Sequence, residues 1–349
     1  MYQFRIMIKV LLLCLCMAAC TDNDKEHSII LPEQEPEGGV SSDYTELLNK
    51  TTPVPPEYNQ EFALKGSVVQ IDYDTQNYVE GNGEMRKNTA YVYLPYGYEE
   101  VSEQCYNVFY FVHGHGETAA SFFENEDRLL RKLLDHMIAN GDMAPAIVVS
   151  TSYVYGTPVD YYPDADPYCK ALPQELVNDL IPIVESRYHT YTESTDIVGI
   201  KASREHRAIG GFSMGAVTTW YALEYTLDCF KYFMPISSDS WSLGRFAGMD
   251  YPTETADYFA NIVRSATSSK NDFYIWACSG TDDVAYDRIW TQVQAMAQLS
   301  DVFSVGNLTF HEQEGARHEF RSLAEYLYNA LPFLFPNLSL IHISEPTRP

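Results

Sequence analysis

Ser213 is the residue whose surroundings point most clearly to chemistry. It lies between two glycines in Gly211-Phe-Ser-Met-Gly215, which has the pattern G-x-S-x-G. The segment "HRAIGG" before it is typical of a strand, and "AVTTWYALEY" after it is typical of a helix. A serine on a sharp turn between a strand and a helix exposes its hydroxyl, and the flanking glycines permit the turn. The pattern therefore predicts Ser213 as a nucleophile.

A serine nucleophile needs a general base, and in this arrangement the histidine follows the serine and the acid along the chain. His311, His318 and His342 follow Ser213. His311 lies inside the alternating strand "LTFHEQEG", and His342 lies in a tail that does not continue the pattern of the domain. His318 follows "EGAR" in the loop after that strand, where a base can reach the serine hydroxyl. His318 is therefore the predicted base.

The acid that orients the imidazole has three candidates. The strand "FYIWACSG" ends at Thr281-Asp-Asp283, which places two carboxylates at the carboxyl end of a strand, where open α/β sheets bind ligands. One of this pair could cap the next helix instead. Asp239, which follows the strand "YFMPISS", is the competing position. The residues by themselves leave Asp282, Asp283 and Asp239 open.

Backbone amides that stabilise a developing oxyanion are predicted at two places. One is the amide of Met214, directly after the nucleophile. The other lies in "HGHG", residues 113–116, which follows the strand "YNVFYFV" as similar motifs do in other enzymes with this turn. We assign it to His115 and Gly116. His113 and His115 could alternatively be metal ligands, but no third ligand of suitable spacing accompanies them, so we predict no metal and no cofactor.

The charge and the N-terminus bear on partners and location. A formal net charge of −25 leaves no cationic surplus to neutralise phosphates, so we expect no nucleic-acid partner. Residues 1–20 have the charge-then-apolar order of a signal peptide, and their apolar run is too short to span a bilayer. The stretch "MAAC" resembles a bacterial lipobox and predicts lipidation of Cys20. An ordinary signal peptide that contains a cysteine is the alternative.

The rest of the chain divides into three parts. Residues 21–58 are rich in Glu, Pro, Ser and Gly and are predicted to be a flexible tether. Residues 59–336 are the predicted folded domain. Residues 337–349 follow a proline stop and do not look native, because "SLIHISEPTRP" resembles translated sequencing-adapter DNA. We therefore expect an extracytoplasmic protein, periplasmic or at the cell surface, that contacts the outer membrane only through its lipid anchor.

Strands alternate with helices from about residue 66. The segments "GSVVQIDYD" and "NTAYVYLPYGY" predict paired strands, and "YNVFYFVHG" and "PAIVVSTSY" predict buried parallel strands. Pro182 is expected to kink the second helix. Helices are predicted around residues 119–139, 172–188, 214–226, 284–299 and 319–331. The alternation predicts an α/β fold with a doubly wound, mostly parallel sheet and helices on both faces.

Seven segments within about residues 66–336 share their pattern with a known family: "YVYLPYGY", "YNVFYFVHGHG", "QELVNDLIPIVESRY", "SREHRAIGGFSMGAVTTWY", "YFMPIS", "GTDDVAY" and "GARHEF". They resemble the esterase domains of carbohydrate esterase family 1, especially feruloyl and acetylxylan esterases of gut Bacteroidetes and clostridia. The resemblance implies the α/β-hydrolase fold, with Ser213 as nucleophile and His318 as base. It places the acid at the second aspartate of the Gly-Thr-x-Asp turn, Asp283.

The same resemblance implies a secreted serine esterase that hydrolyses feruloyl (hydroxycinnamoyl) esters on plant cell-wall xylan or xylo-oligosaccharides without a cofactor. Aromatic side chains expected at the carboxyl edge of the sheet are predicted to stack on the substrate, namely Tyr153, Tyr155 and Trp241. An acetylxylan esterase is the nearest alternative, and the fold also hosts acyltransferases, siderophore-ester hydrolases and peptidases. The alternative of another class is a non-catalytic glycan-binding lipoprotein.

Overall fold

The computed structural model describes residues 44–98, 103–124, 130–155, 159–266 and 272–336. The predicted signal peptide with Cys20, most of the predicted tether and the predicted non-native tail lie outside these residues. Among the described residues, we find no helix with the length and apolar character that a membrane crossing requires.

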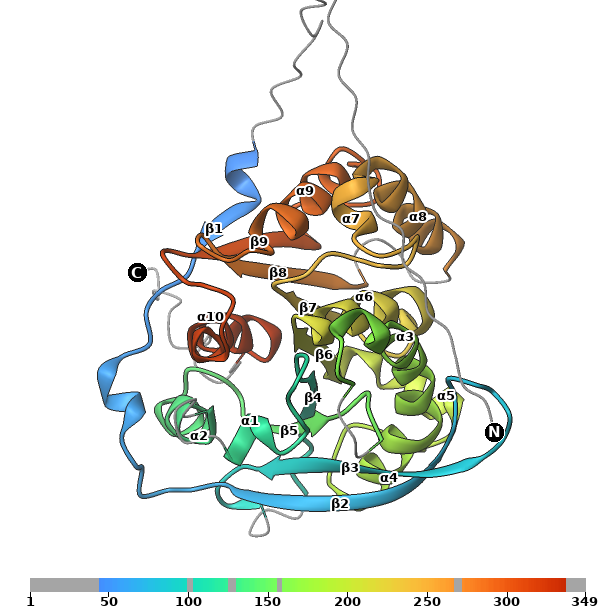
Figure 1. Cartoon of the computed structure of the whole chain (residues 1–349). Coiled ribbons are helices and arrows are strands. Elements are labelled where there is room, and N and C mark those ends of the chain that lie inside the picture. The colour runs from blue at the N-terminus through green and yellow to red at the C-terminus, as the bar shows by residue number, and fades with distance from the viewer. Residues whose placement is uncertain (1–43, 99–102, 125–129, 156–158, 267–271, 337–349) are drawn as a thin grey trace, which may run out of the picture. The chain divides into compact units, whose positions relative to one another are not determined.

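A mixed sheet of nine strands lies at the centre of the domain, in the order β1-β9-β8-β7-β6-β4-β5-β3-β2 (Figure 1). The strands are β1 Leu48–Lys50, β2 Ser67–Gln76, β3 Met85–Leu94, β4 Asn107–Val112, β5 Ala146–Thr151, β6 Arg207–Phe212, β7 Tyr232–Ile236, β8 Tyr274–Gly280 and β9 Leu308–Gln313. Strand β3 pairs antiparallel with β2 and with β5, and the other neighbours pair in parallel. The prediction of a mostly parallel sheet is confirmed.

Helices cover both faces of the sheet, as predicted (Figure 1). They are α1 Ser121–Glu124, α2 Leu130–Asn140, α3 Asp166–Glu175, α4 Ile181–Arg187, α5 Ile197–Ala202, α6 Met214–Thr226, α7 Ala247–Asp250, α8 Pro252–Ser265, α9 Tyr286–Ala297 and α10 Leu323–Leu334. Helices α2 and α10 pack on one face, and α3, α6, α8 and α9 contribute to the apolar core on the other.

The central strand β4 shows how the sheet forms two cores. Val108, Tyr110 and Val112 point into the core that contains α3, α6 and α9, whereas Phe109 and Phe111 point into the core that contains α2 and α10. Each fully buried side chain of this size stabilises the fold by about 1.5–3 kcal/mol relative to exposure. Because both faces of the strand are buried, its sequence is continuously apolar instead of alternating.

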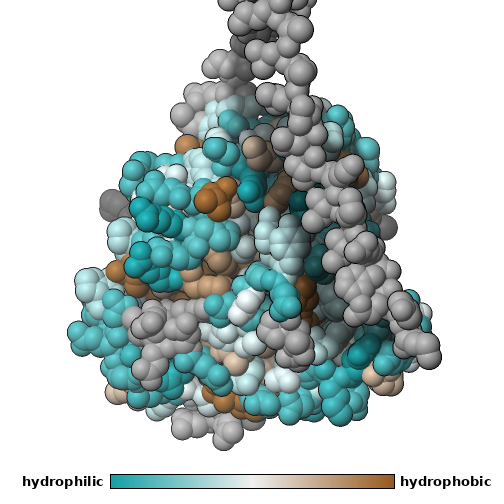
Figure 2. Space-filling view, in the orientation of Figure 1, coloured by the Kyte–Doolittle hydropathy of each residue, from teal (hydrophilic) through white to brown (hydrophobic). Residues whose placement is uncertain are grey.

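The surface contrasts with these two cores. The face seen in Figure 2 is mostly hydrophilic, and its apolar residues form small separate patches. Scattered apolar residues of this kind are ordinary for a folded domain. The hydrophilic surface agrees with the large negative charge of the chain.

The predicted tether is wrong at its C-terminal end. Strand β1 pairs in parallel with β9, and Phe310 N donates to Leu47 O at 2.8 Å. Leu47 and Tyr58 are buried. A strand of three residues in a proline-rich segment shows no periodicity, so only its tertiary pairing reveals it. Residues 44–58 therefore belong to the folded domain.

The helix predicted over residues 172–188 begins earlier and is interrupted. Helix α3 leads into a π-helical turn, Leu176–Leu180, in which Ile181 N donates to Leu176 O. Helix α4 follows, with Pro182 in its first turn, where the missing N–H of proline is tolerated. The sequence predicted a kink at Pro182. The irregularity that the structure shows is the π-helical turn that ends just before α4.

Candidate active site

Ser213 lies where β6 ends and α6 begins. Its backbone has φ 57° and ψ −113°, a conformation that non-glycine residues rarely adopt. Such strain costs about 1–3 kcal/mol and persists only where the surrounding structure enforces it. Here Ser213 N donates to Ile236 O of β7 at 2.9 Å, which fixes the turn. The turn leaves the serine partly exposed at the carboxyl edge of the sheet.

The two glycines of the motif permit close packing under this turn. A Cβ atom at Gly215 would lie 2.1 Å from the Val112 carbonyl oxygen at the end of β4. A Cβ atom at Gly211 would lie 2.5 Å from the Gly215 carbonyl oxygen. Any side chain at either position would push α6 away from the sheet. The pattern G-x-S-x-G is therefore a packing requirement of the strand-to-helix turn.

The structure brings the three predicted catalytic residues together. The His318 Nε2 atom lies 2.9 Å from Ser213 Oγ, and His318 Nδ1 lies 2.8 Å from Asp283 Oδ1. Asp283 follows β8 and His318 follows β9, so three loops at one edge of the sheet supply the set. If Nδ1 carries the proton and donates to the carboxylate, Nε2 is free to accept the serine proton.

Burial and contacts distinguish the three candidates for the acid. Asp283 is 6% exposed, and its Oδ1 also accepts a hydrogen bond from Ala285 N at 2.7 Å. The neighbouring Asp282 is exposed to solvent. Asp239 is buried but accepts a hydrogen bond from Met249 N at 3.1 Å, and burial raises its pKa to about 6. Of the three candidates, only Asp283 is hydrogen-bonded to His318.

The predicted oxyanion amides are only partly brought together. Met214 is the first residue of α6, and amides in the first turn of a helix lack acceptors within it and point toward an anion. His115 lines the same cavity as Ser213, together with Gly114, which the sequence analysis did not assign. Gly116, with φ 78°, turns the chain and is not among the lining residues. The second donor stays a prediction, with His115 in the cavity lining and Gly116 outside it.

The alternative of a histidine metal site finds no support in the contacts of these side chains. His113 Nε2 lies 2.8 Å from Ser152 Oγ, and His115 Nε2 lies 2.6 Å from the Val159 carbonyl oxygen. Within the part of the chain that the structure describes, no three His, Cys, Asp or Glu side chains are grouped as metal ligands.

A cavity of about 410 Å³ opens beside Ser213 and has aromatic walls. Trp241, predicted to contact substrate, lines it. Trp241 packs edge-to-face on Phe246, with ring centroids 5.2 Å apart. The larger lining side chains that sequence reasoning missed include Tyr162, Phe246, Arg288 and Phe320. Phe246 and Arg288 come from chain that follows β7 and β8, so their position after parallel strands was the available signal.

The two predicted substrate tyrosines do not line this cavity. Tyr153 is 3% exposed, and its ring packs on His113 with centroids 4.7 Å apart. The Tyr155 hydroxyl donates to Glu175 Oε2 at 3.0 Å. Burial raises the pKa of Glu175 to about 7 despite its hydrogen bonds. Tyr153 therefore belongs to the core, and the half-buried Tyr155 is held by Glu175 of α3 away from the cavity.

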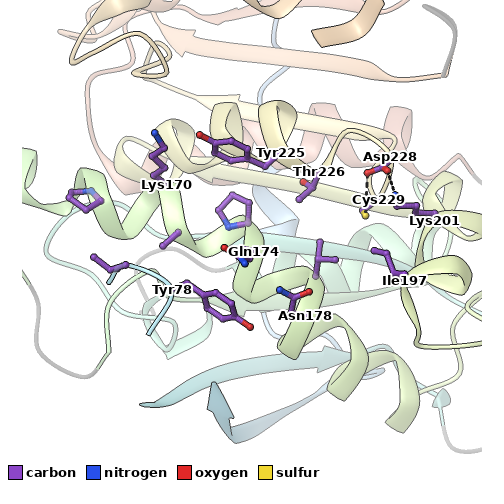
Figure 3. A pocket seen from close by; sticks show the side chains of 15 residues that line it. Tyr78, Lys170, Gln174, Asn178, Ile197, Lys201, Tyr225, Thr226, Asp228 and Cys229 are labelled. Carbon is purple, nitrogen blue, oxygen red and sulfur yellow. Dashed lines mark hydrogen bonds and ion pairs between the residues drawn. The ribbon is translucent and has the colours of Figure 1, made fainter. Parts of the chain in front are cut away.

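A second hollow of about 670 Å³ lies elsewhere on the domain (Figure 3). Lys170, Gln174 and Asn178 project into it from α3 and the π-helical turn, and Tyr225 faces it from the end of α6. Its lysine Lys201 is paired with Asp228. No serine or histidine is among its lining residues, so the smaller cavity is the candidate active site.

The sequence that carries Ser213, His318 and Asp283 matches a known family. The family model described as "Putative esterase" matches residues 83–331. The chain belongs to this esterase family. The match confirms the predicted resemblance to esterases of carbohydrate esterase family 1.

The proteins similar to the chain include two curated relatives and a solved structure. The chain is 37% identical over 290 residues to endo-1,4-beta-xylanase Y of Acetivibrio thermocellus, covering 81% of this chain and 24% of that protein. It is 31% identical over 159 residues to an endo-1,4-beta-xylanase/feruloyl esterase of Xylanibacter ruminicola, covering 44% of this chain and 19% of that protein. The chain therefore spans about a quarter or less of these relatives.

The solved structure is a serine-to-alanine mutant of the feruloyl esterase module from Clostridium thermocellum complexed with sinapinate. It is 36% identical, covers 83% of this chain and 95% of the module, and has a TM-score of 0.71. Since the module is matched over almost its whole length, the α/β-hydrolase fold expected from the sequence is confirmed.

Proposed function

We propose that the chain is a serine esterase that releases feruloyl-type acyl groups from plant xylan. The observation that carries this proposal is the continuous set of contacts from Ser213 Oγ through the His318 imidazole to Asp283, at 2.9 and 2.8 Å, beside an aromatic cavity. The names of the relatives support the substrate class, because one is a xylanase/feruloyl esterase and another was solved with sinapinate.

The residues suit a two-step acyl transfer. His318 Nε2 takes the proton from Ser213 Oγ as the oxygen attacks the ester carbonyl, and Asp283 stabilises the resulting imidazolium. The amides of Met214 and His115 would stabilise the oxyanion. The sugar hydroxyl leaves with the proton from His318. Water then attacks the acyl-enzyme with His318 as base, which releases the hydroxycinnamic acid and restores the serine.

The cavity favours an aromatic acyl group over an acetyl group. Its volume of about 410 Å³ lies in the range typical of sites for ligands much larger than acetate. Tyr162, Phe246 and Phe320 contribute partly exposed rings to its walls, whereas Trp241 is 3% exposed and packs edge-to-face on Phe246. Stacking of a planar acyl group on such rings contributes about 0.5–1.5 kcal/mol beyond simple burial. An acetyl group would leave these walls in contact with water.

Methyl ferulate is therefore expected to have a higher kcat/KM than an acetylated xylo-oligosaccharide, by roughly three- to tenfold from stacking alone. The measurement compares both substrates with p-nitrophenyl acetate, which reports whether the serine is reactive. Faster release of acetate with hardly any release of ferulate would make the protein an acetylxylan esterase. No turnover of any of the three esters would instead favour a non-catalytic glycan-binding protein.

We propose further that the protein is exported and held in the outer membrane by a lipid on Cys20, with the domain in the periplasm or at the cell surface. The support is the order of charged and apolar residues before Cys20 and the stretch "MAAC". A Cys20→Ser variant is expected to shift from the membrane fraction to the soluble fraction of a bacterial host. Equal membrane association of both proteins would contradict the lipid anchor.

A further inference from the structure

Arg288 is a charged residue of the active-site cavity that the mechanism above does not use. It extends from α9, is half-buried, and lines the cavity together with Ser213 and Trp241. Its guanidinium carbon lies 4.3 Å from the centroid of the Phe246 ring. Among the described residues, the structure shows no hydrogen bond or ion pair for this guanidinium. An arginine carries five N–H donors, so the cavity holds a set of strong donors available to a ligand.

The lining of the cavity around Arg288 differs in charge from the strongly acidic chain as a whole. The protein has a formal net charge of −25, yet no Asp or Glu is among the residues that line the cavity. The catalytic Asp283 lies behind His318, and the buried Asp239 accepts a hydrogen bond from Met249 N. Arg288 contacts the Phe246 ring and interacts electrostatically with Asp239, and its N–H groups have no hydrogen bond among the described residues. The cavity is therefore suited to a substrate that brings oxygen acceptors.

The Phe246 ring contacts the guanidinium of Arg288 and so helps to position its N–H groups. The backbone of Phe246 has φ 61°, in the left-handed region that is strained for a bulky side chain. The ring packs against Trp241 on one side and contacts the Arg288 guanidinium. The left-handed backbone at Phe246 therefore holds at the cavity the ring that contacts Arg288. Because Arg288 lies over the Phe246 ring, its N–H groups are what this part of the cavity presents to an aromatic acyl group.

We propose that Arg288 binds the oxygen substituents of the aromatic acyl ring and so selects 4-hydroxy-3-methoxycinnamoyl esters over unsubstituted cinnamoyl esters. This inference rests on the proposed feruloyl esterase activity. The planar guanidinium presents parallel N–H groups that match two neighbouring acceptors, and a phenolic oxygen beside a methoxy oxygen is such a pair. A lysine could supply the charge but not this paired geometry.

The test compares kcat/KM for methyl ferulate, methyl 4-hydroxycinnamate and methyl cinnamate in the wild type and in Arg288→Met and Arg288→Lys. Hydrogen bonds to a charged group predict a wild-type preference for ferulate over cinnamate of roughly tenfold to hundredfold. In Arg288→Met the ratio should fall to near one, and Arg288→Lys should retain part of it. Because each ratio is taken within one variant, a general loss of activity does not affect it.

Arg245 provides a matched control. Its guanidinium carbon lies 5.3 Å from the same Phe246 ring, but the side chain is exposed and does not line the cavity. Arg245→Met removes the same charge from the same neighbourhood and should keep the wild-type ratio. A fall of the ratio in Arg245→Met equal to that in Arg288→Met would mean that net charge, and not the Arg288 contact, sets the preference, which overturns the inference.

A binding measurement separates this inference from the proposed function. Calorimetry on Ser213→Ala, with and without Arg288→Met, gives the Kd for ferulate and cinnamate without turnover. A preference for ferulate that disappears with Arg288→Met supports the inference. An unchanged ratio of Kd values overturns it even if feruloyl esters are hydrolysed. Turnover of p-nitrophenyl acetate without turnover of any cinnamoyl ester contradicts the proposed function, while the Kd ratio still decides the role of Arg288.

Discussion

Replacing Ser213 with alanine is expected to lower kcat on every ester substrate by about 10³-fold or more, because loss of a triad member removes the covalent route. The hydroxyl contacts His318 Nε2 at the cavity wall, and the backbone of the turn is fixed by the bond from Ser213 N to Ile236 O. The fold should therefore survive the change. The measurement is kcat on methyl ferulate and on p-nitrophenyl acetate, with the melting temperature followed in parallel.

Ser242→Ala is a suitable control for this experiment. Ser242 lies in the loop after β7, and its hydroxyl accepts a hydrogen bond from Ser240 Oγ at 3.0 Å, outside the cavity lining. It should retain wild-type kcat. If Ser213→Ala kept more than a tenth of the wild-type rate, another group would have to be the nucleophile.

Asp283→Asn is expected to lower kcat by about 10⁴-fold, the size of effect measured for an asparagine at the orienting position of a triad. The asparagine amide would donate to His318 Nδ1, which favours the tautomer whose Nε2 carries a proton and cannot accept one from Ser213. Asp283 Oδ1 contacts both His318 Nδ1 and Ala285 N, the latter at 2.7 Å, so this orientation of the amide gives up the bond from Ala285 N. The opposite orientation keeps both bonds but loses the negative charge that stabilises the imidazolium.

Asp282→Asn is the matched control, because it makes the same chemical change at the neighbouring, exposed position. It should change kcat little. The opposite ranking of the two variants would contradict the assignment of the acid. So would mild effects of both accompanied by a severe effect of Asp239→Asn, because Asp239 is the competing buried carboxylate.

The sequence was sufficient for Ser213 and His318 because their signals are local, whereas the residues alone left the acid open and the family resemblance chose Asp283. The G-x-S-x-G pattern reflects distances that glycine alone tolerates, such as the 2.1 Å that a Cβ at Gly215 would leave to the Val112 carbonyl oxygen. His318 and Asp283 follow recognisable strands, β9 and β8, and parallel strands bring their carboxyl ends to one edge. Chain order and strand direction together therefore fix which side chains can meet.

The parts that sequence reasoning missed depend on where a loop turns after it leaves the sheet. Tyr153 and Tyr155 leave β5 at the correct edge, but hydrogen bonding to the buried Glu175 draws Tyr155 inward. Phe246 reaches the cavity through a left-handed backbone conformation that nothing in its own residue type indicates. Arg288 lies two residues into α9, where a charged side chain is normally solvated. Tertiary contacts determine the direction in which each of these segments turns.

Helix α8, Pro252–Ser265, was not predicted, although its sequence has the pattern of a helix. It begins with Pro252 in the first turn, and its buried residues include Ala256, Phe259, Ala260 and Val263. Their spacing of three and four residues is that of an amphipathic helix, and proline is favoured at this starting position. The strand β1 had no comparable signal, since three residues are too few to show a period.

Strand β1 covers the edge of the sheet that β9 would otherwise form. Without Leu48–Lys50, the backbone groups of β9 that now bond to Leu47 O and Thr51 N would face solvent as an open edge. Open edges can recruit strands from other molecules and lead to aggregation. A truncated protein that begins at residue 59 would lose this cover while keeping every catalytic residue. Residues 44–58, which precede the rest of the domain, thus also oppose self-association. A recombinant protein should therefore begin before residue 44.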